Sequence, residues 1–180
     1  MIRTYRGTRP RIAPGAYIDQ SAQVIGDVEI GERSSVWMCA VVRGDVNYIR
    51  IGAETNIQDN SVLHVYRERH PLILGDRVTV GHSVTLHGCA IESDCLIGMG
   101  AVVLNGARIG SGSIIGAGAV VTEGTIVPPR SLFLGAPAKF RRQLGDEDLQ
   151  GIRRYAANYV EYTATYLAEC GAGSGPEIQR

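Results

Sequence analysis

An aliphatic residue recurs every six positions along most of this chain, with glycine and other small residues between. From Val24 the sequence runs VIGDVE, IGERSS and VWMCAV, and from Ile109 the same rhythm returns as IGSGSI, IGAGAV and VTEGTI. A strict six-residue period with one inward aliphatic residue is typical of a parallel β-helix, in which each block forms a short strand and a corner. Three such blocks complete one triangular coil, so residues about 18 apart stack on neighbouring coils. The sequence therefore predicts a mainly β, prism-shaped fold.

The inward positions can be followed along the chain although the repeat is interrupted. The rhythm slips over Val42–Ile51, over Leu63–Leu74 and, by one residue, over Leu86–Ile91. The first two slips insert extra residues and are predicted to be loops that leave the corners. The 23 glycines suit tight corners, and the two Phe and one Trp suit a narrow interior. The residues predicted to point inward are Val24, Ile30, Val36, Val42, Ile51, Ile57, Leu63, Leu74, Val80, Leu86, Ile91, Ile97, Val103, Ile109, Ile115, Val121 and Val127.

Two of the four histidines fall in one column of this lattice. With the loops set aside, the outward positions of one face carry, in order, Arg43, His64, His87 and Leu104. Side chains alternate along a strand and neighbouring coils lie ~4.8 Å apart, so the two imidazoles stack. Two rings at that separation can bind one metal ion through Zn–N bonds of ~2.0–2.1 Å.

A third histidine belongs to the neighbouring face. His82 is expected to stack above Asp59 near a corner, around which it is separated from His87. One chain is therefore not expected to bring three rings together, whereas a second copy could present its His82 to the His64/His87 pair. The closed symmetry of a three-sided prism favours a homotrimer with metal sites between subunits. An outward histidine is more often a solvated surface residue, but this stacking favours a site with three ligands and one open position.

The segments around these histidines resemble those of γ-class carbonic anhydrases. The resemblance is carried by Arg43-Gly44-Asp45, Asn56-Ile57-Gln58-Asp59, His64, Gly81-His82 and His87-Gly88, and it covers residues 10 to about 140. The segment Gly135-Ala136-Pro137-Ala138-Lys139 matches a motif shared with hexapeptide acyltransferases, so it supports the fold alone. The resemblance implies a left-handed β-helix that forms a homotrimer with a site at each subunit interface.

The resemblance also implies a metal-dependent reaction. His64 and His87 of one chain and His82 of the next would bind Zn²⁺, and the same imidazoles suit Fe²⁺ and Co²⁺. CO2 would be hydrated reversibly to bicarbonate by a metal-bound hydroxide, which makes the protein a carbonate dehydratase. Gln58 would orient the nucleophile and Asn56 would hydrogen-bond near it.

Three charged residues of the resembling segments are implied to act at the interface. Arg43 and Asp59 would form an ion pair between subunits, with Asp45 in the same network, because a bidentate arginine–carboxylate pair fixes register. A purely structural role at the interface is the alternative to direct participation in catalysis.

One departure from the resembling family bears on the rate. Well-characterised members carry a longer acidic loop with a proton-shuttling glutamate, whereas the stretch 46–50 here is short and has no acid. Hydration needs a route for the released proton. Glu68 or His70 of the following loop could replace the missing acid, and ordinary solvation is the alternative for both. We therefore expect low anhydrase activity and a subgroup without the acidic loop.

The chain is predicted to be a single domain over residues 1–180. The β-helix is expected over about 10–140, a helix packed along the prism over about 146–170, and a flexible tail over 171–180. Asp146, Glu147 and Asp148 suit the positive end of the helix dipole. Tyr159 is the candidate helix residue to reach the metal pocket, since the resembling family places a polar side chain there, with simple packing as the alternative. The predicted buried stripe consists of Leu149, Ile152, Ala156, Tyr159, Thr163, Leu167 and Cys170.

Composition limits the partners and the other function classes. With 18 basic and 18 acidic residues and no basic stripe, nucleic-acid binding is not expected. The polar start of the chain predicts neither a secretory signal nor a membrane span, and four cysteines without C-x-x-C pairing fit a cytoplasmic protein. The alternatives are a CoA-dependent hexapeptide acyltransferase using His70 as its base, a non-catalytic metal-binding scaffold, and a thioesterase-type accessory relative.

Overall fold

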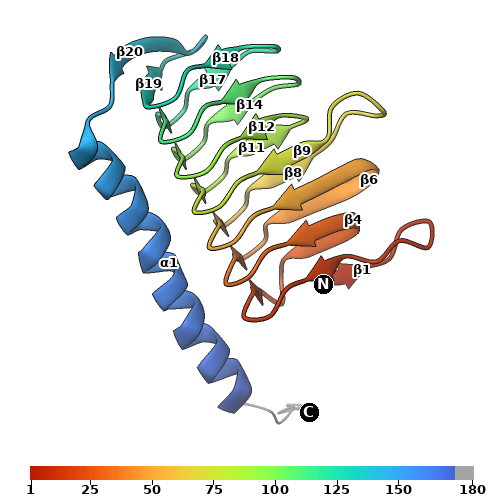
Figure 1. The fold of residues 1–180 in the computed structure, drawn as a ribbon. Helices are drawn as coiled ribbons and strands as arrows, with labels where there is room; N and C mark the ends of the chain where they lie inside the picture. Colours follow the sequence, from red (N-terminus) through yellow and green to blue (C-terminus); the bar gives the residue numbers. More distant parts are fainter. Residues whose placement is uncertain (173–180) are drawn as a thin grey trace.

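The computed structural model describes residues 1–172, which form a stack of short strands flanked by one long helix (Figure 1). The tail predicted over 171–180 lies, from residue 173 onward, outside the described residues. The elements are β1 (Ile2–Arg3), β2 (Arg11–Ile12), β3 (Tyr17–Ile18), β4 (Gln23–Ile30), β5 (Ser35–Val36), β6 (Val41–Ile51), β7 (Asn56–Ile57), β8 (Val62–His64), β9 (Leu72–Leu74), β10 (Thr79–Val80), β11 (Thr85–His87), β12 (Ala90–Ile91), β13 (Leu96–Ile97), β14 (Val102–Val103), β15 (Arg108–Ile109), β16 (Ile114–Ile115), β17 (Val120–Val121), β18 (Ile126–Val127), β19 (Ser131–Leu134), β20 (Lys139–Gln143) and α1 (Asp146–Ala172).

The strands lie on the faces of a parallel β-helix, as the six-residue repeat predicts. One sheet runs β17-β14-β11-β8-β6-β9-β12-β15-β18 and so wraps two faces, joined through β6. The other sheet runs β20-β19-β16-β13-β10-β7-β5-β3. Neighbouring strands are parallel, and among the strand pairs of the described chain only the last, β19 with β20, is antiparallel. The predicted fold class is confirmed.

The aliphatic residues of the repeat fill the interior. Every position predicted to point inward is buried, with an exposed fraction of at most the 4% of Ile51. The register confirms the predicted columns, because Leu63 pairs with Val42 on one side and with Leu86 on the other, and Leu86 pairs with Val103. Each buried aliphatic side chain contributes ~1.5–3 kcal/mol, so this column is the main source of stability.

The corners depend on left-handed turn residues and on buried hydroxyl groups. Gly100, Gly106, Gly112, Gly118 and Gly124 recur every six residues with positive φ between 66° and 69°. Elsewhere a hydroxyl ties one coil to the next: Thr55 Oγ1 donates to the carbonyl of Gly75 over 2.8 Å, and the Thr55 amide donates to Ser34 Oγ over 2.9 Å. The repeat thus satisfies its buried polar groups at the corners.

The first slip is not the loop that the sequence predicts. Strand β6 continues without a break through all of Val41–Ile51 beside the long strand β4. The register shifts between Gly26 and Val28, which pair with Gly44 and Ile49, so the extra residues bulge outward from a continuous strand. The chain can bend here because residue 26 is a glycine. Gly26 adopts a φ of +79° and lies so close to the carbonyl of Gly44 that a Cβ atom would overlap it.

The second slip is a loop, as predicted. It leaves the prism after Val65 and returns at Pro71 as a small antiparallel turn bridged by Tyr66 and His70. The third slip is absorbed without a loop, since Leu86 and Val103 pair directly although only 17 residues separate them.

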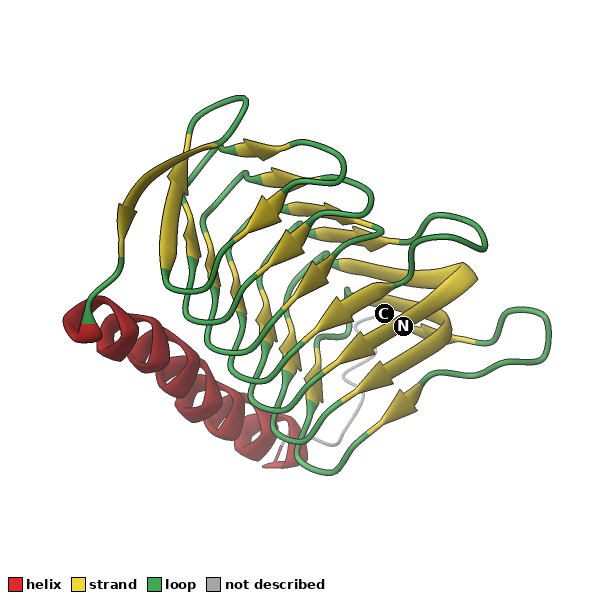
Figure 2. Ribbon diagram, turned by 45° about the horizontal axis from the view of Figure 1, so that its top comes forward, coloured by secondary structure: helices red, strands yellow, loops and turns green. Residues whose placement is uncertain are grey.

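Helix α1 lies along one side of the prism (Figure 2) and contacts β3, β5 and β10. Ile152, Ala156 and Thr163 of the predicted stripe are buried against it, whereas Leu167 is 39% exposed and the neighbouring Tyr166 ring packs on the prism instead, with its centroid 5.0 Å from that of Trp37. Cys170, the last predicted member, has no described side chain. No helix of the described chain is long and apolar enough to cross a membrane.

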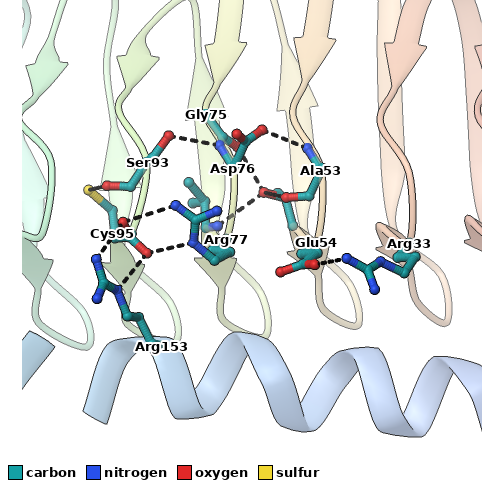
Figure 3. Close-up of polar contacts among 12 residues, drawn as sticks. Arg33, Ala53, Glu54, Gly75, Asp76, Arg77, Ser93, Cys95 and Arg153 are labelled. Carbon is teal, nitrogen blue, oxygen red and sulfur yellow. Dashed lines mark hydrogen bonds and ion pairs between the residues drawn. The ribbon is translucent and has the colours of Figure 1, made fainter. Parts of the chain in front are cut away.

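An ion-pair cluster fastens the first half of the helix to the prism. Arg77 approaches the Asp94 carboxylate with two contacts of 2.8 and 3.1 Å, and Arg153 of α1 approaches the same carboxylate with contacts of 3.2 and 3.4 Å. Figure 3 shows Arg153 extending from the helix to the same carboxylate that Arg77 contacts from the prism. The helix position is therefore set by charge as well as by apolar contact.

Candidate metal centre

His64 and His87 face each other from adjacent coils. They end strands β8 and β11 and pair directly in the register, one residue after the buried Leu63 and Leu86. Their ring centroids lie 5.0 Å apart, and His64 Nδ1 lies 3.1 Å from His87 Nε2. The predicted stacked pair is present.

The outer nitrogen of His64 is held by a carboxylate. His64 Nε2 lies 2.9 Å from Asp45 Oδ1, and Arg43 pairs with the other oxygen of the same group. Burial alone would raise the pKa of Asp45, but the hydrogen bonds from His64 and Arg43 outweigh it and lower that pKa. An ionised carboxylate only accepts, so His64 Nε2 carries the hydrogen and Nδ1 carries a lone pair when the ring is neutral.

The outer nitrogen of His87 is held by an amide. His87 Nδ1 lies 2.7 Å from Asn105 Oδ1, and Asn105 Nδ2 donates to Glu123 Oε1 over 2.8 Å. With the amide oxygen toward the ring, His87 Nδ1 carries the hydrogen and Nε2 carries the lone pair. Both facing nitrogens are therefore acceptors in the neutral rings.

These two acceptors fit a divalent transition-metal ion. Lone pairs 3.1 Å apart repel unless a proton or a cation lies between them. Two nitrogens bound to one tetrahedral ion at ~2.05 Å lie about 3.3 Å apart, close to the observed separation. Neutral imidazoles whose second nitrogen donates to a carboxylate or carbonyl are the usual ligands of Zn²⁺, Fe²⁺ or Co²⁺.

His82 is prepared in the same way but in another place. His82 Nδ1 lies 2.8 Å from Asp59 Oδ2 at the neighbouring corner, as the lattice predicts, and the imidazole is 45% exposed. Among the described residues, no three His, Cys, Asp or Glu side chains form a group that could hold a metal ion. One chain therefore offers two nitrogens at one place and a third at another.

A recess of about 290 Å³ opens beside His82, between α1 and the prism. It is lined by Gln58 and Tyr159 and mainly by apolar groups such as Met99. Gln58 Nε2 donates to Asn56 Oδ1 over 3.1 Å, and Asn56 Nδ2 donates to Thr79 Oγ1 over 3.0 Å. Both amides are buried, so this ladder fixes the Gln58 side chain at the recess.

Tyr159 lies at the same recess. Its ring packs edge-on against Trp37 with centroids 5.3 Å apart. Burial, followed by the nearby Asp59 carboxylate, raises the pKa of its hydroxyl, so Tyr159 stays protonated near neutral pH. The residue thus packs against the prism and also lines the recess.

The charged residues of the resembling segments divide between the two places. Within one chain Arg43 pairs with Asp45, and Asp59 pairs with His82. The ion pair between Arg43 and Asp59 would have to join two subunits, and it stays a prediction.

Relatives of the chain include proteins named carbonic anhydrases. Residues 88–123 match the family described as bacterial transferase hexapeptide (six repeats). The chain is 44% identical over 165 residues to gamma carbonic anhydrase 1, mitochondrial, of Arabidopsis thaliana, covering 89% of this chain and 60% of that protein. It is 46% identical over 168 residues to a carbonic anhydrase of Geobacillus kaustophilus, covering 93% of this chain and 92% of that protein. The chain belongs to the γ-carbonic anhydrase family.

A solved structure has the same fold as this γ-carbonic anhydrase family member. It is a hexapeptide transferase family protein from Anaplasma phagocytophilum, with a TM-score of 0.88 and 38% identity over 92% of this chain and 97% of that one. The fold is thus shared with a protein named for transferase chemistry, so the activity has to be argued from the site.

The two candidate proton carriers lie on the loop after β8. The Glu68 side chain is 86% exposed at the tip, 4.0 Å from Arg67. The His70 ring lies beside Gly106, with its centroid 6.0 Å from that of Tyr66. In this γ-carbonic anhydrase family member the bulge of β6 contacts the same loop, because Asn47 Nδ2 donates to the Tyr66 carbonyl over 3.1 Å.

Two residues of the site, Asn105 and Glu123, are missed by the sequence argument. The column itself does not lead to them, since Leu86 pairs with Val103 and the outward position stacked on His87 is therefore Leu104, one residue before Asn105. Glu123 likewise lies one residue beyond the continuation of the column, because Val103 pairs with Val121.

Proposed function

We propose that this chain is a metal-dependent carbonate dehydratase that hydrates CO2 reversibly to bicarbonate. The observation that carries the proposal is the pair of acceptor nitrogens of His64 and His87, which face each other at 3.1 Å with both outer nitrogens occupied. This arrangement serves a cation and has no evident structural purpose without one. The kinship with carbonic anhydrases supplies the reaction class.

The complete site belongs to a homotrimer. His64 and His87 of one subunit and His82 of the next would bind Zn²⁺, or Fe²⁺ or Co²⁺, with one position left open. The separation of His82 from the pair within one chain, and its 45% exposure, support this division. When bound, the ion would lower the pKa of water toward neutrality and so supply the nucleophile.

The residues around His82 would handle the substrate. The amide ladder from Thr79 through Asn56 holds Gln58, whose Oε1 is left to accept a hydrogen bond and orient a water molecule. CO2 is apolar, and the mainly apolar wall beside Gln58 would receive it without desolvating a polar group. Tyr159 closes the recess from the helix side.

Proton release is expected to limit the rate. Residues 46–50 of β6 include no acid; Val46 and Tyr48 are exposed there, and Arg50 packs 4.6 Å from the Tyr48 ring. Glu68 and His70 are the candidate carriers that the following loop offers, and the Glu68 side chain is exposed to solvent. We therefore propose an enzyme with low hydration activity.

The cysteines support a reducing location such as the cytoplasm. Cys39, Cys89 and Cys95 are free thiols in the described chain. Burial raises the pKa of Cys89 and of Cys95 to about 12, so both stay protonated and serve as core residues rather than as ligands.

The test combines elemental analysis with stopped-flow CO2 hydration on protein purified without oxygen. About one transition-metal ion per chain and metal-dependent hydration are expected. Metal without hydration would favour the non-catalytic scaffold. Metal-free protein that binds coenzyme A would replace the proposal with an acyltransferase, for which His70 is the available base.

A further inference from the structure

A line of hydrogen-bonding side chains continues from His87 over two further coils. Asn105 and Glu123 lie on these coils, each one residue beyond the outward position that the register stacks on His87, because Leu86 pairs with Val103 and Val103 pairs with Val121. The contacts form one line: His64 Nδ1 to His87 Nε2, His87 Nδ1 to Asn105 Oδ1, and Asn105 Nδ2 to Glu123 Oε1, at 3.1, 2.7 and 2.8 Å. Each member therefore meets the next within hydrogen-bond distance.

The chemistry of the last member fixes the direction of every bond before it. An ionised carboxylate has no hydrogen to donate, so the group of Asn105 that faces Glu123 must be its NH₂. The amide oxygen is then turned toward His87, because the amide is planar and its two ends are opposite in character. An oxygen at 2.7 Å from His87 Nδ1 requires a hydrogen on that nitrogen.

Without the hydrogen bonds from Glu123 through Asn105, nothing would favour the Nδ1–H tautomer of His87 over the Nε2–H tautomer. The amide of Asn105 could rotate and offer its NH₂ to His87 Nδ1, which would place the hydrogen on His87 Nε2. That nitrogen faces His64 Nδ1 at 3.1 Å and would then be closed to a cation.

We propose that Asn105, oriented by Glu123, is a positioning residue that keeps His87 in its Nδ1–H tautomer and its Nε2 open for metal. The proposal deepens the proposed function and rests on it only for the identity of the ligand. Asp45 does the same for His64 directly, whereas the carboxylate of Glu123 acts on His87 through a neutral amide.

The carboxylates of Asp45 and Glu123 bring little net negative charge to the two histidines. Arg43 compensates the carboxylate that touches His64, and the carboxylate behind His87 is one residue removed from the ring. Little uncompensated negative charge therefore reaches the ligands, which keeps a bound cation strongly electron-withdrawing.

The first measurement needs no metal. Imidazole ¹⁵N shifts of the metal-free protein, recorded at about pH 8 so that the rings are neutral, report the tautomer of His87. The wild-type protein is expected to show Nδ1–H, and Asn105→Ala and Glu123→Ala are expected to shift His87 toward Nε2–H. Glu123→Gln should lie between, because its amide can either accept from Asn105 or donate to it. Nε2–H in the wild type, or an unchanged tautomer in both alanine variants, would overturn the proposal.

The second measurement is Zn²⁺ affinity by competition with a chelator. Asn105→Ala is expected to weaken binding ~10–100-fold, with a smaller loss in Glu123→Ala. Glu92→Ala is the matched control, because Glu92 also accepts a hydrogen bond from the next coil, from the Ser111 amide at 2.8 Å, but away from the histidines. An equal loss of Zn²⁺ affinity in Glu92→Ala would show that loss of any such contact between coils weakens binding, and it would overturn the role of Asn105. A wild type that takes up no Zn²⁺ yet keeps Nδ1–H would refute the proposed function while supporting this orientation of His87.

Discussion

At the scale of the residue, the surroundings of His64 hold its ring neutral. Burial lowers the pKa of His64, and Arg43 and His87 lower it further, while the hydrogen bond to Asp45 acts in the opposite direction and is outweighed. A neutral imidazole is the form that binds metal, because the protonated ring has no free lone pair. Because these surroundings disfavour the protonated ring, they keep the lone pair of His64 available to a metal ion.

Removal of either stacked imidazole is expected to empty the site without unfolding the chain. His64→Ala and His87→Ala should each lose metal almost completely, because both rings point outward and neither fills the interior. Elemental analysis with far-ultraviolet circular dichroism checks both halves of this expectation. His70→Ala is the control and should keep its metal; wild-type metal content in either of the first two variants would show that the ligands are misassigned.

Alanine substitutions at two glycines distinguish the free-energy cost of a left-handed backbone from the cost of a steric overlap between coils. Gly118 has a φ of +66° and open surroundings, so Gly118→Ala should cost about 1–2 kcal/mol through the left-handed conformation alone. Gly31 has no positive φ, but an added Cβ would lie 2.5 Å from the Gly52 carbonyl on the next coil. Gly31→Ala should therefore cost about 3 kcal/mol. Unfolding in denaturant compares the two, and equal costs would contradict the close coil contact.

The six-residue repeat predicts much of this site but not its supporting partners. It places His87 above His64 and His82 above Asp59, because inward residues must keep register and outward residues then follow. It does not predict that Asp45 reaches His64, since Asp45 lies in the bulge where the repeat is suspended. Polar partners across an interruption depend on backbone geometry that periodicity does not encode.

At the scale of the element, helix α1 is held by two different kinds of contact. In its first half, Arg153 forms an ion pair with Asp94 of the prism. Its second half packs tyrosine rings on the prism, with Tyr166 5.5 Å from Tyr17 and 5.0 Å from Trp37. Acids in the first turn predict the start at Asp146 correctly, and the predicted stripe includes Tyr159, but it does not include Tyr166, because a helix tyrosine outside the stripe is equally consistent with a surface residue.

The ionic half of this attachment should depend on pH. Hydrogen bonds from Arg77 lower the pKa of Asp94 most, with Arg153 adding to the effect against the opposing burial. A lowered folded-state pKa means that the stabilisation is complete above the unfolded pKa of about 3.9 and is lost as the pH falls through the folded value. Asp94→Asn should cost about 1–2 kcal/mol at neutral pH, given the partial exposure of both arginines.

Denaturation curves at several acidic pH values check this dependence. The difference in stability between wild type and Asp94→Asn should shrink as the pH falls, because the protonated wild-type carboxyl resembles the amide. Glu147→Gln, at an exposed carboxylate of the same helix, is the control. A difference that stays constant down to the lowest pH would rule out the ion pair as its cause.

The interruptions of the repeat show where prediction of the strands stops. A slip reveals extra residues, yet it does not tell whether they leave the prism or widen a strand. Residues 66–70 leave it as a loop, whereas residues 45–48 bulge within strand β6, whose pairing with β4 resumes at Ile49, because Gly26 and Gly44 allow the two backbones to bend together. The outcome depends on the neighbouring coil and not on the inserted residues alone.

At the scale of the whole molecule, the prism presents half of a proposed site on each of two surfaces. One surface carries the His64/His87 pair with its supports, and the corner beside the recess carries His82. Neither half has an obvious use alone. Three copies around a three-fold axis would join each half to its complement three times over, which is why we propose a trimer.

Arg43 is expected to contribute to this assembly. Its side chain is 41% exposed in the single chain while it pairs with Asp45, so the guanidinium can also reach a carboxylate of a neighbour. Arg43→Ala should weaken the trimer about 10-fold or more, as measured by sedimentation over a range of concentrations. Arg11→Ala removes a 70% exposed arginine paired with Glu29 and should leave assembly unchanged. An unaltered trimer in Arg43→Ala would confine that residue to supporting Asp45 and His64.

The most direct test of a shared metal site is complementation between two defective chains. His82→Ala keeps the stacked pair, and His64→Ala keeps the third ligand, so trimers of either variant alone should hold no metal. When the two are produced together and mixed trimers are isolated by differential tags, about one metal ion per trimer is expected, against about three in the wild type, because one interface then combines both intact halves. Mixed trimers without metal would contradict the division of the site between subunits.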